Sequence, residues 1–167
     1  DGQRILFGWV PTKIDCDDRK NFEWAGTFVA HEVYQREDGT LGVRIPDTVW
    51  EAFGERNRME DFVIDGLNKR TEKVIEKACG ELYSLEADIS FTEGTHSFGI
   101  RMLENEETQQ SYQYMFRAGE NRYVFEKNPN WPWFDCMNIG LERPIELEPG
   151  KTYHVQMIVD DTIATIY

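Results

Sequence analysis

Three apolar runs near the N-terminus predict β-strands. They cover residues 4–10, 28–35 and 41–45, and each is rich in β-branched or aromatic residues. The dipeptide Asp38-Gly39 lies between the second and third runs. It is typical of a tight hairpin, because both of its residues tolerate positive φ angles. We therefore expect two paired strands here, preceded by a further strand.

Polar and turn-forming residues flank these runs. We expect Pro11 to end the first strand, since proline cannot donate a ladder hydrogen bond. Residues 12–23 are polar and charged, and they predict a long loop. Asp47 is expected to cap a short helix that carries Trp50 and Phe53 on one face.

The stretch over residues 54–80 is densely charged and is expected to connect two structural units. Apolar positions at 74, 75 and 78 suit one short amphipathic helix over residues 71–79. A strand with a bulge fits the same positions nearly as well.

From residue 81 onwards, apolar and polar residues alternate in short runs that are separated by turn signals. Several short strands at regular spacing predict an antiparallel β-sandwich. We expect this region, rather than the N-terminal strands, to hold the main hydrophobic core. The expected core residues are Phe91, Phe98, Ile100, Tyr114, Phe116, Phe125, Val155, Ile158 and Ile163.

Composition and charge narrow the classes of partner. The chain has 167 residues, of which 40% are hydrophobic and 13% aromatic, and these values predict a globular protein. Its formal net charge of −13 repels the phosphates of nucleic acids and of anionic membranes. No apolar run is long enough to span a membrane. A neutral ligand or a protein partner fits this charge better.

The cysteines do not predict a metal site. Cys16, Cys79 and Cys136 lie far apart and form no C-x-x-C pair, so a zinc ribbon is not expected. Three buried thiols fit this spacing, and so does one disulfide with a free thiol. The acidic residues around Cys16 lack the glycine and the terminal glutamate of an EF-hand. We expect neither a metal nor a cofactor.

Several motifs follow one another in a specific order along the chain. They are Arg4-Ile5-Leu6-Phe7-Gly8-Trp9-Val10, Trp24-Ala25-Gly26, His31-Glu32-Val33, Asp38-Gly39-Thr40-Leu41 and Pro46. This order resembles the end of the catalytic domain in glycoside hydrolase family 32, which contains invertases, levanases and inulinases. The stretches Tyr123 to Glu126 and Val159 to Tyr167 resemble strands of the β-sandwich that follows in that family.

The resemblance implies a five-bladed β-propeller followed by a concanavalin-like β-sandwich. Residues 1–53 would then be terminal propeller-type strands with a hairpin, residues 54–80 the connector, and residues 81–167 the sandwich module. Because the chain opens and closes on apolar β-runs, we expect a piece of a larger polypeptide, with the sandwich cut at its C-terminal end. Two departures mark a divergent branch: Ala30-His31 replaces the family's Pro-Arg, and Asp161-Thr162 replaces its Arg-Ser.

The catalytic carboxylates that the resemblance implies are absent from this sequence. A retaining glycosidase needs two carboxyl groups about 5–5.5 Å apart, one as nucleophile and one as acid/base. The family carries its carboxylates in Asn-Asp-Pro, Arg-Asp-Pro and Glu-Cys motifs, and this chain has no Asp-Pro or Glu-Cys dipeptide. His31 and Glu32 are neighbours on a predicted strand and face opposite ways. We therefore expect no catalytic residue here, although the parent protein would be a glycoside hydrolase.

One loop has the composition of a carbohydrate-binding surface, because it combines flat aromatic rings with amide groups. Its candidate residues are Trp131, Trp133, Phe134, Asn128 and Asn130. The prolines at 129 and 132 disfavour a ladder strand and stiffen the loop. The same rings would also serve to cover a sandwich core, to pack on the propeller or to make an oligomer contact.

Three functions fit these observations. The first is a non-catalytic accessory module that docks on the catalytic propeller of the same polypeptide and stabilises it. The second is a carbohydrate-binding module that uses the aromatic loop to hold an oligo- or polysaccharide such as fructan. The third is an unrelated lectin-like or structural sandwich. We favour the first, and the resemblance suggests a secreted protein, extracellular or periplasmic.

Overall fold

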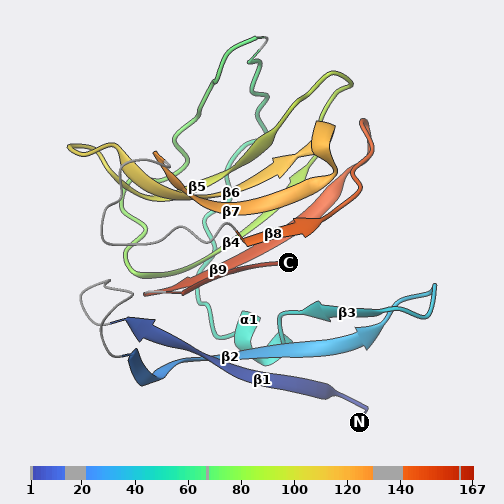
Figure 1. Ribbon diagram of the computed structural model, residues 1–167, viewed down its shortest axis with the longest axis vertical. Helices are drawn as coiled ribbons and strands as arrows, with labels where there is room; N and C mark the ends of the chain where they lie inside the picture. The colour runs from blue at the N-terminus through green and yellow to red at the C-terminus, as the bar shows by residue number, and fades with distance from the viewer. Residues whose placement is uncertain (1, 14–21, 67, 130–140, 162) are drawn as a thin grey trace. The chain divides into compact units, whose positions relative to one another are not determined.

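The computed structural model describes residues 2–13, 22–66, 68–129, 141–161 and 163–167 (Figure 1). They form a mostly β protein with three small antiparallel sheets and almost no helix, which confirms the expected class of mostly β. Contacts between residues divide the chain into two compact units. The first unit comprises Asp1–Val10, Gly26–Ala87 and Val155–Tyr167, and the second comprises Pro11–Ala25 and Asp88–His154.

The first sheet has the strand order β1-β2-β3. Its strands are β1 (Arg4–Lys13), β2 (Phe22–Gln35) and β3 (Leu41–Arg44). The hairpin between β2 and β3 forms where Asp38-Gly39 predicts it. Gly39 has a φ of 87°, and Asp38 accepts hydrogen bonds from the Thr40 amide at 2.9 Å and from its hydroxyl at 2.7 Å.

Two boundaries of this sheet differ from the expectation. β1 continues through Pro11 to Lys13, so the prediction that Pro11 ends the strand is wrong. β1 lies at the edge of its sheet, where a residue without an N–H donor is tolerated. β2 begins at Phe22, inside the expected loop over residues 12–23. The rest of that loop, residues 14–21, lies outside the described residues.

The short helix α1 (Asp47–Trp50) forms close to where the sequence predicts it. The rings of Trp50 and Phe53 lie 6.2 Å apart between centroids, as their spacing implies. Pro46, however, occupies the N-cap position, so Asp47 already belongs to the first turn and makes no capping hydrogen bond through its side chain. Among the described residues, no helix has the length and apolar character needed to cross a lipid bilayer.

The described part of the connector, residues 54–80, is irregular. It forms neither the short helix nor the bulged strand that were expected over residues 71–79. Val74 and Ile75 are 65% and 44% exposed, so these apolar side chains do not form a buried face. A short helix without such burial is marginal in water.

The second sheet has the strand order β10-β9-β4. Its strands are β4 (Leu82–Ile89), β9 (Tyr153–Asp160) and β10 (Ile163–Ile166). Burial alternates along β9: Val155, Met157 and Val159 are at most 6% exposed. Ile158 lies between them and faces the other way, so its expected place beside Val155 in the core is wrong.

The third sheet has the strand order β5-β6-β7-β8. Its strands are β5 (Phe98–Asn105), β6 (Gln110–Arg117), β7 (Arg122–Asn128) and β8 (Leu141–Pro144), with the 3-10 turn η2 (Ala118–Glu120) joining β6 to β7. One face is aromatic. Phe98 stacks on Phe116 at 5.3 Å between centroids, and Tyr114 lies 4.8 Å from Phe125.

The fully buried apolar side chains that the structure describes concentrate in the second half of the chain. All but Ile45 lie between Phe91 and Val159. This confirms that the region from residue 81 onwards carries the main hydrophobic core. Of the expected core residues, Phe91, Tyr114, Phe116 and Val155 are buried, whereas Phe98, Ile100, Phe125 and Ile163 are half-buried.

Candidate functional site

The first sheet exposes apolar side chains on both of its faces. Phe7 stacks on Phe28 at 5.1 Å between centroids, which places odd-numbered residues of β1 and even-numbered residues of β2 on the same face. We call this the aromatic face, and its apolar residues Phe7, Trp9, Phe28 and Tyr34 are 37–63% exposed. On the opposite, aliphatic face, Leu6, Val10, Leu41 and Val43 are 47–66% exposed.

Glu32 is the polar centre of the aromatic face. It is 7% exposed, and its carboxylate accepts hydrogen bonds from Arg44 Nη2 at 2.6 Å and from Gln3 Nε2 at 3.2 Å. The bond from Arg44, and then the bond from Gln3, lower the pKa of Glu32 below its ordinary value. A carboxylate with these two partners is held as an anion and is suited to positioning the sheet rather than to proton transfer.

His31 lies on the aliphatic face and contacts Tyr167 at the end of β10. The Tyr167 hydroxyl and His31 Nδ1 are 2.5 Å apart, and the rings are 5.5 Å apart between centroids. Burial lowers the pKa of His31 and raises the pKa of Tyr167. Both shifts favour the neutral forms, so the phenol donates a hydrogen bond to the unprotonated imidazole nitrogen.

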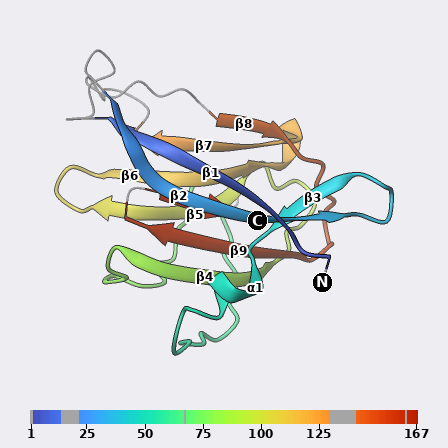
Figure 2. The same cartoon turned by 90° about the horizontal axis from the view of Figure 1, so that it is seen from below.

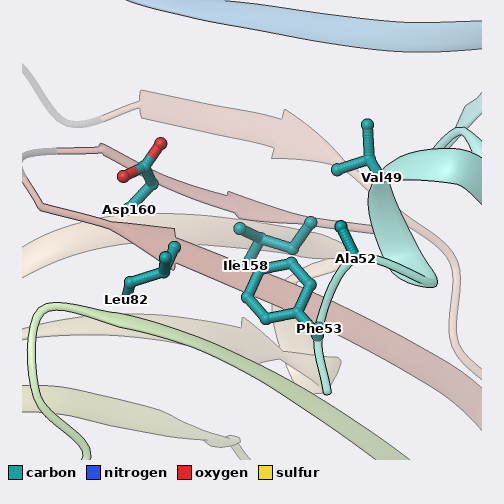
Figure 3. Close-up of a pocket in the computed structure, with 6 residues that line it drawn as sticks. All are labelled: Val49, Ala52, Phe53, Leu82, Ile158 and Asp160. Carbon is teal, nitrogen blue, oxygen red and sulfur yellow. The ribbon is translucent and has the colours of Figure 1, made fainter.

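The segment after β3 packs on the face of the second sheet that carries Ile158, opposite the buried row of β9. Figure 2 shows α1 close to β4 and β9. A hollow of about 250 Å³ lies at this contact (Figure 3), and its walls are Val49, Ala52 and Phe53 on one side and Leu82, Ile158 and Asp160 on the other. Its lining is apolar apart from the Asp160 carboxylate. This contact explains why Ile158, which faces away from the buried row of β9, is still half-buried.

Charged side chains form the rim of the same contact. Arg56 lies over the Trp50 ring at 5.4 Å and pairs with Glu86 of β4 at 3.3 Å. Gln156 of β9 donates a hydrogen bond to Glu86 at 3.1 Å. Exposed pairs of this kind contribute little stability, so the apolar centre holds the contact together. We call the whole contact the docking interface: His31, Val49, Ala52 and Phe53 against Leu82, Ile158 and Tyr167.

The sequence contains a signal for this interface that the strand pattern alone did not resolve. Met157, Ile158 and Val159 form a continuous apolar run, which is typical of a strand buried on both faces. If buried and exposed side chains simply alternated along β9, Ile158 would have no packing partner. The residues that face Ile158 are Val49 of α1 and Ala52 and Phe53 after it, more than one hundred residues earlier in the chain, so only the fold reveals them.

The structure places one of the residues predicted to bind carbohydrate. Asn128 is the last residue of β7, where it pairs with Ser111 of β6. The other candidates, Asn130, Trp131, Trp133 and Phe134, lie outside the described residues.

The cysteines and the acidic residues add no metal site to this picture. Cys79 is an exposed free thiol, so the interpretation with three buried thiols is wrong, whereas Cys16 and Cys136 lie outside the described residues. Within the part of the chain that the structure describes, no three His, Cys, Asp or Glu residues cluster as metal ligands would.

Comparison with known proteins assigns the chain to no family. No family model matches the sequence, and no curated protein is significantly similar to it.

Proposed function

We propose that this chain is the C-terminal part of a family 32-like glycoside hydrolase. In this proposal the second and third sheets form a non-catalytic β-sandwich module, and the first sheet belongs to the last blade of the catalytic propeller. The module docks on that blade and stabilises it. The observation that carries the proposal is the first sheet, which meets the second sheet at the docking interface and still exposes apolar side chains on both faces.

The exposure of the first sheet supports its role as a blade. An antiparallel sheet with one solvated face alternates between apolar and polar residues. The first sheet instead presents Leu6 and Phe7, two consecutive residues that face opposite ways, and both are more than half exposed. Propeller blades are antiparallel sheets packed face to face around a central axis. Apolar patches on both faces are expected where further sheets pack.

The burial pattern supports the sandwich. The second sheet buries Met157 and Val159 on one face, and the third sheet buries Tyr114 and Phe116 on its aromatic face. In a β-sandwich, two antiparallel sheets pack apolar faces of this kind together to form the core.

The local chemistry supports a structural role. Glu32 is paired with Arg44 and Gln3, and His31 is paired with Tyr167, on opposite faces of β2. Neither residue is arranged as a glycosidase carboxylate pair, which requires two carboxyl groups at a defined separation. The catalytic residues of the proposed enzyme would lie in the propeller of the same polypeptide.

Two measurements test this function. The chain alone, incubated with sucrose, levan or inulin, should release no reducing sugar above a buffer control. Peptide sequencing of the native polypeptide that carries this chain should find a preceding propeller with Asn-Asp-Pro, and that polypeptide should hydrolyse one of these substrates. Release by the chain alone, abolished by Glu32→Gln, would overturn the proposal.

Carbohydrate binding is a second candidate function. Its supporting observation is a row of hydrogen-bonding side chains across β6 and β7 that ends at Asn128. Glycan-array binding by the chain separates this function from a docking role alone.

A further inference from the structure

One face of the third sheet carries polar side chains across β6 and β7. Side chains of directly paired residues lie on the same face, as do those of alternate residues along a strand. The register therefore gathers four pairs on the face opposite the aromatic one, and one of them, Met115 with Val124, is apolar. We call the three polar pairs the polar row: Ser111 with Asn128, Gln113 with Glu126, and Arg117 with Arg122.

Glu126 is the centre of the polar row. Its Oε1 accepts a hydrogen bond from Gln113 Nε2 at 2.7 Å, and its Oε2 accepts one from Arg117 Nη2 at 3.1 Å. Both Gln113 and Glu126 are only 8% exposed. An ionised carboxylate offers about four acceptor sites, so these two bonds leave about half of them for other donors. The site is held rigidly, because each member lies on a strand and is fixed by its neighbour.

Ser111 indicates that the row is incomplete without a further group. It is 1% exposed, and its Oγ has no hydrogen-bond partner among the described residues. Buried hydroxyls are nearly always paired, with protein or with ordered water. The Ser111 hydroxyl lies on the same face as Gln113, one strand alternation away. It therefore adds an unsatisfied donor and acceptor to the buried end of the row.

The polar row becomes accessible toward the turn between β6 and β7. The side chains of Arg117 and Arg122 are 31% and 33% exposed, compared with 10% for Glu126. Arg122 pairs with Glu142 at 2.6 Å and also with Glu120. Guanidinium and carboxylate groups thus alternate along the accessible end. The carboxylates would repel a polyanion, and the guanidinium groups would repel a polycation. This surface therefore favours a neutral ligand.

We propose that the polar row binds a neutral oligosaccharide. Sugar hydroxyl groups both donate and accept hydrogen bonds, so they match a surface on which carboxylate, amide, guanidinium and hydroxyl groups alternate. Sugar hydroxyls would donate to Glu126, accept from Arg117 and satisfy Ser111 at the buried end. This proposal rests on the third sheet alone and does not depend on the docking role.

Calorimetric titration of the whole chain with two neutral probes, inulin oligosaccharides and gluco-oligosaccharides, tests the proposal. One probe should bind, and its addition should shift the backbone amide NMR signals of Ser111, Gln113 and Glu126 more than those of the first sheet. The variants Glu126→Gln and Gln113→Ala should each bind at least about tenfold more weakly, because the first removes the charge that accepts from the sugar and the second removes the hydrogen bond that fixes the Glu126 carboxylate.

A matched pair elsewhere in the chain supplies the control. Gln156 donates to Glu86 between β9 and β4 much as Gln113 donates to Glu126 between β6 and β7. Gln156→Ala should leave sugar affinity unchanged. Should Glu126→Gln fail to fold, Ser111→Ala removes a single hydroxyl and should also weaken binding, and the shift mapping needs no substitution.

Three results would overturn the proposal. The first is the absence of heat and of chemical shift changes with both probes at millimolar concentration. The second is binding that all three row variants leave intact. The third is binding that disappears in a Trp131→Ala, Trp133→Ala variant while the row signals do not move, which would assign the sugar to the aromatic loop.

Discussion

The first and third sheets have similar strand chemistry but arrange it differently. On the third sheet, the aromatic side chains of β5, β6 and β7 lie on one face, and the polar row lies on the other. On the first sheet, apolar residues lie on both faces and most are exposed, and the polar cluster around Glu32 lies among them. The third sheet thus keeps its aromatic rings on one face and its polar row, with Met115 and the buried Val124, on the other, whereas the first sheet leaves apolar surface on both sides that a partner can cover.

The difference has an energetic consequence. Large aromatic side chains bury about 150–250 Å² each when covered. Leaving Phe7, Trp9 and Phe28 more than half exposed forgoes roughly 2 kcal/mol for each ring. A second sheet packed on the aromatic face would recover this free energy, and this supports placing the first sheet in a propeller.

The largest effect should come from a matched pair of substitutions in the two sheets. Phe116 of β6 is 8% exposed and Phe28 of β2 is 63% exposed. Phe116→Ala should lower the free energy of unfolding by about 3–5 kcal/mol, because it leaves a cavity in the buried aromatic face. Phe28→Ala should cost less than about 1 kcal/mol in the isolated chain. Denaturant titration measures both, and equal losses would contradict the comparison.

A smaller effect is expected at the docking interface. Ile158→Ala should lower the free energy of unfolding by about 1–2 kcal/mol, because its side chain is half-buried beside an existing hollow. The neighbouring Met157→Ala is the control, and at 1% exposure it should cost about 2–5 kcal/mol. A loss at Ile158 as large as that at Met157 would return Ile158 to the main core.

The docking interface should also weaken in acid. Burial holds the pKa of His31 below its ordinary value of 6.5. As pH falls below that value the unfolded chain takes up the proton first, so the free energy of unfolding decreases. The decrease continues until the pH reaches the lowered pKa of the folded state, and below it no further loss arises from this group.

Unfolding measured at a series of pH values checks this expectation. His31→Gln should remove this part of the pH dependence, whereas His154→Gln, which alters an exposed histidine of β9, should retain it. An unchanged pH profile in His31→Gln would show that the burial of His31 is not the source of the loss of stability in acid.

Local sequence chemistry predicts the hairpin well, but not the features that depend on distant neighbours. Asp38-Gly39 specifies its own turn, because the glycine supplies the positive φ and the aspartate bonds to Thr40. Pro11 was expected to end β1. A strand can include a proline, however, when the strand lies at the edge of its sheet, as β1 does. That position is a property of the whole sheet and cannot be read from the residues around Pro11.

The two candidate sites depend on the fold to different degrees. The contact between His31 and Tyr167 joins residues 136 positions apart, and no local pattern predicts it. The polar row depends on the register between β6 and β7, since a shift of one residue would move Glu126 to the opposite face from Gln113. Asn128 was the one predicted carbohydrate-binding residue that the described structure places, and it lies at the end of this row.

The association state of the chain tests most directly whether the exposed faces of the first sheet are surfaces that pack against other sheets. Light scattering over a range of concentrations should show that the chain self-associates, because the exposed edges and apolar faces invite pairing. Replacing Phe7, Trp9 and Phe28 together by serine should shift it toward the monomer. Leu141→Ser, which removes a 52% exposed side chain from β8, should not. A chain that stays monomeric at every concentration and scatters like the triple variant would contradict the account.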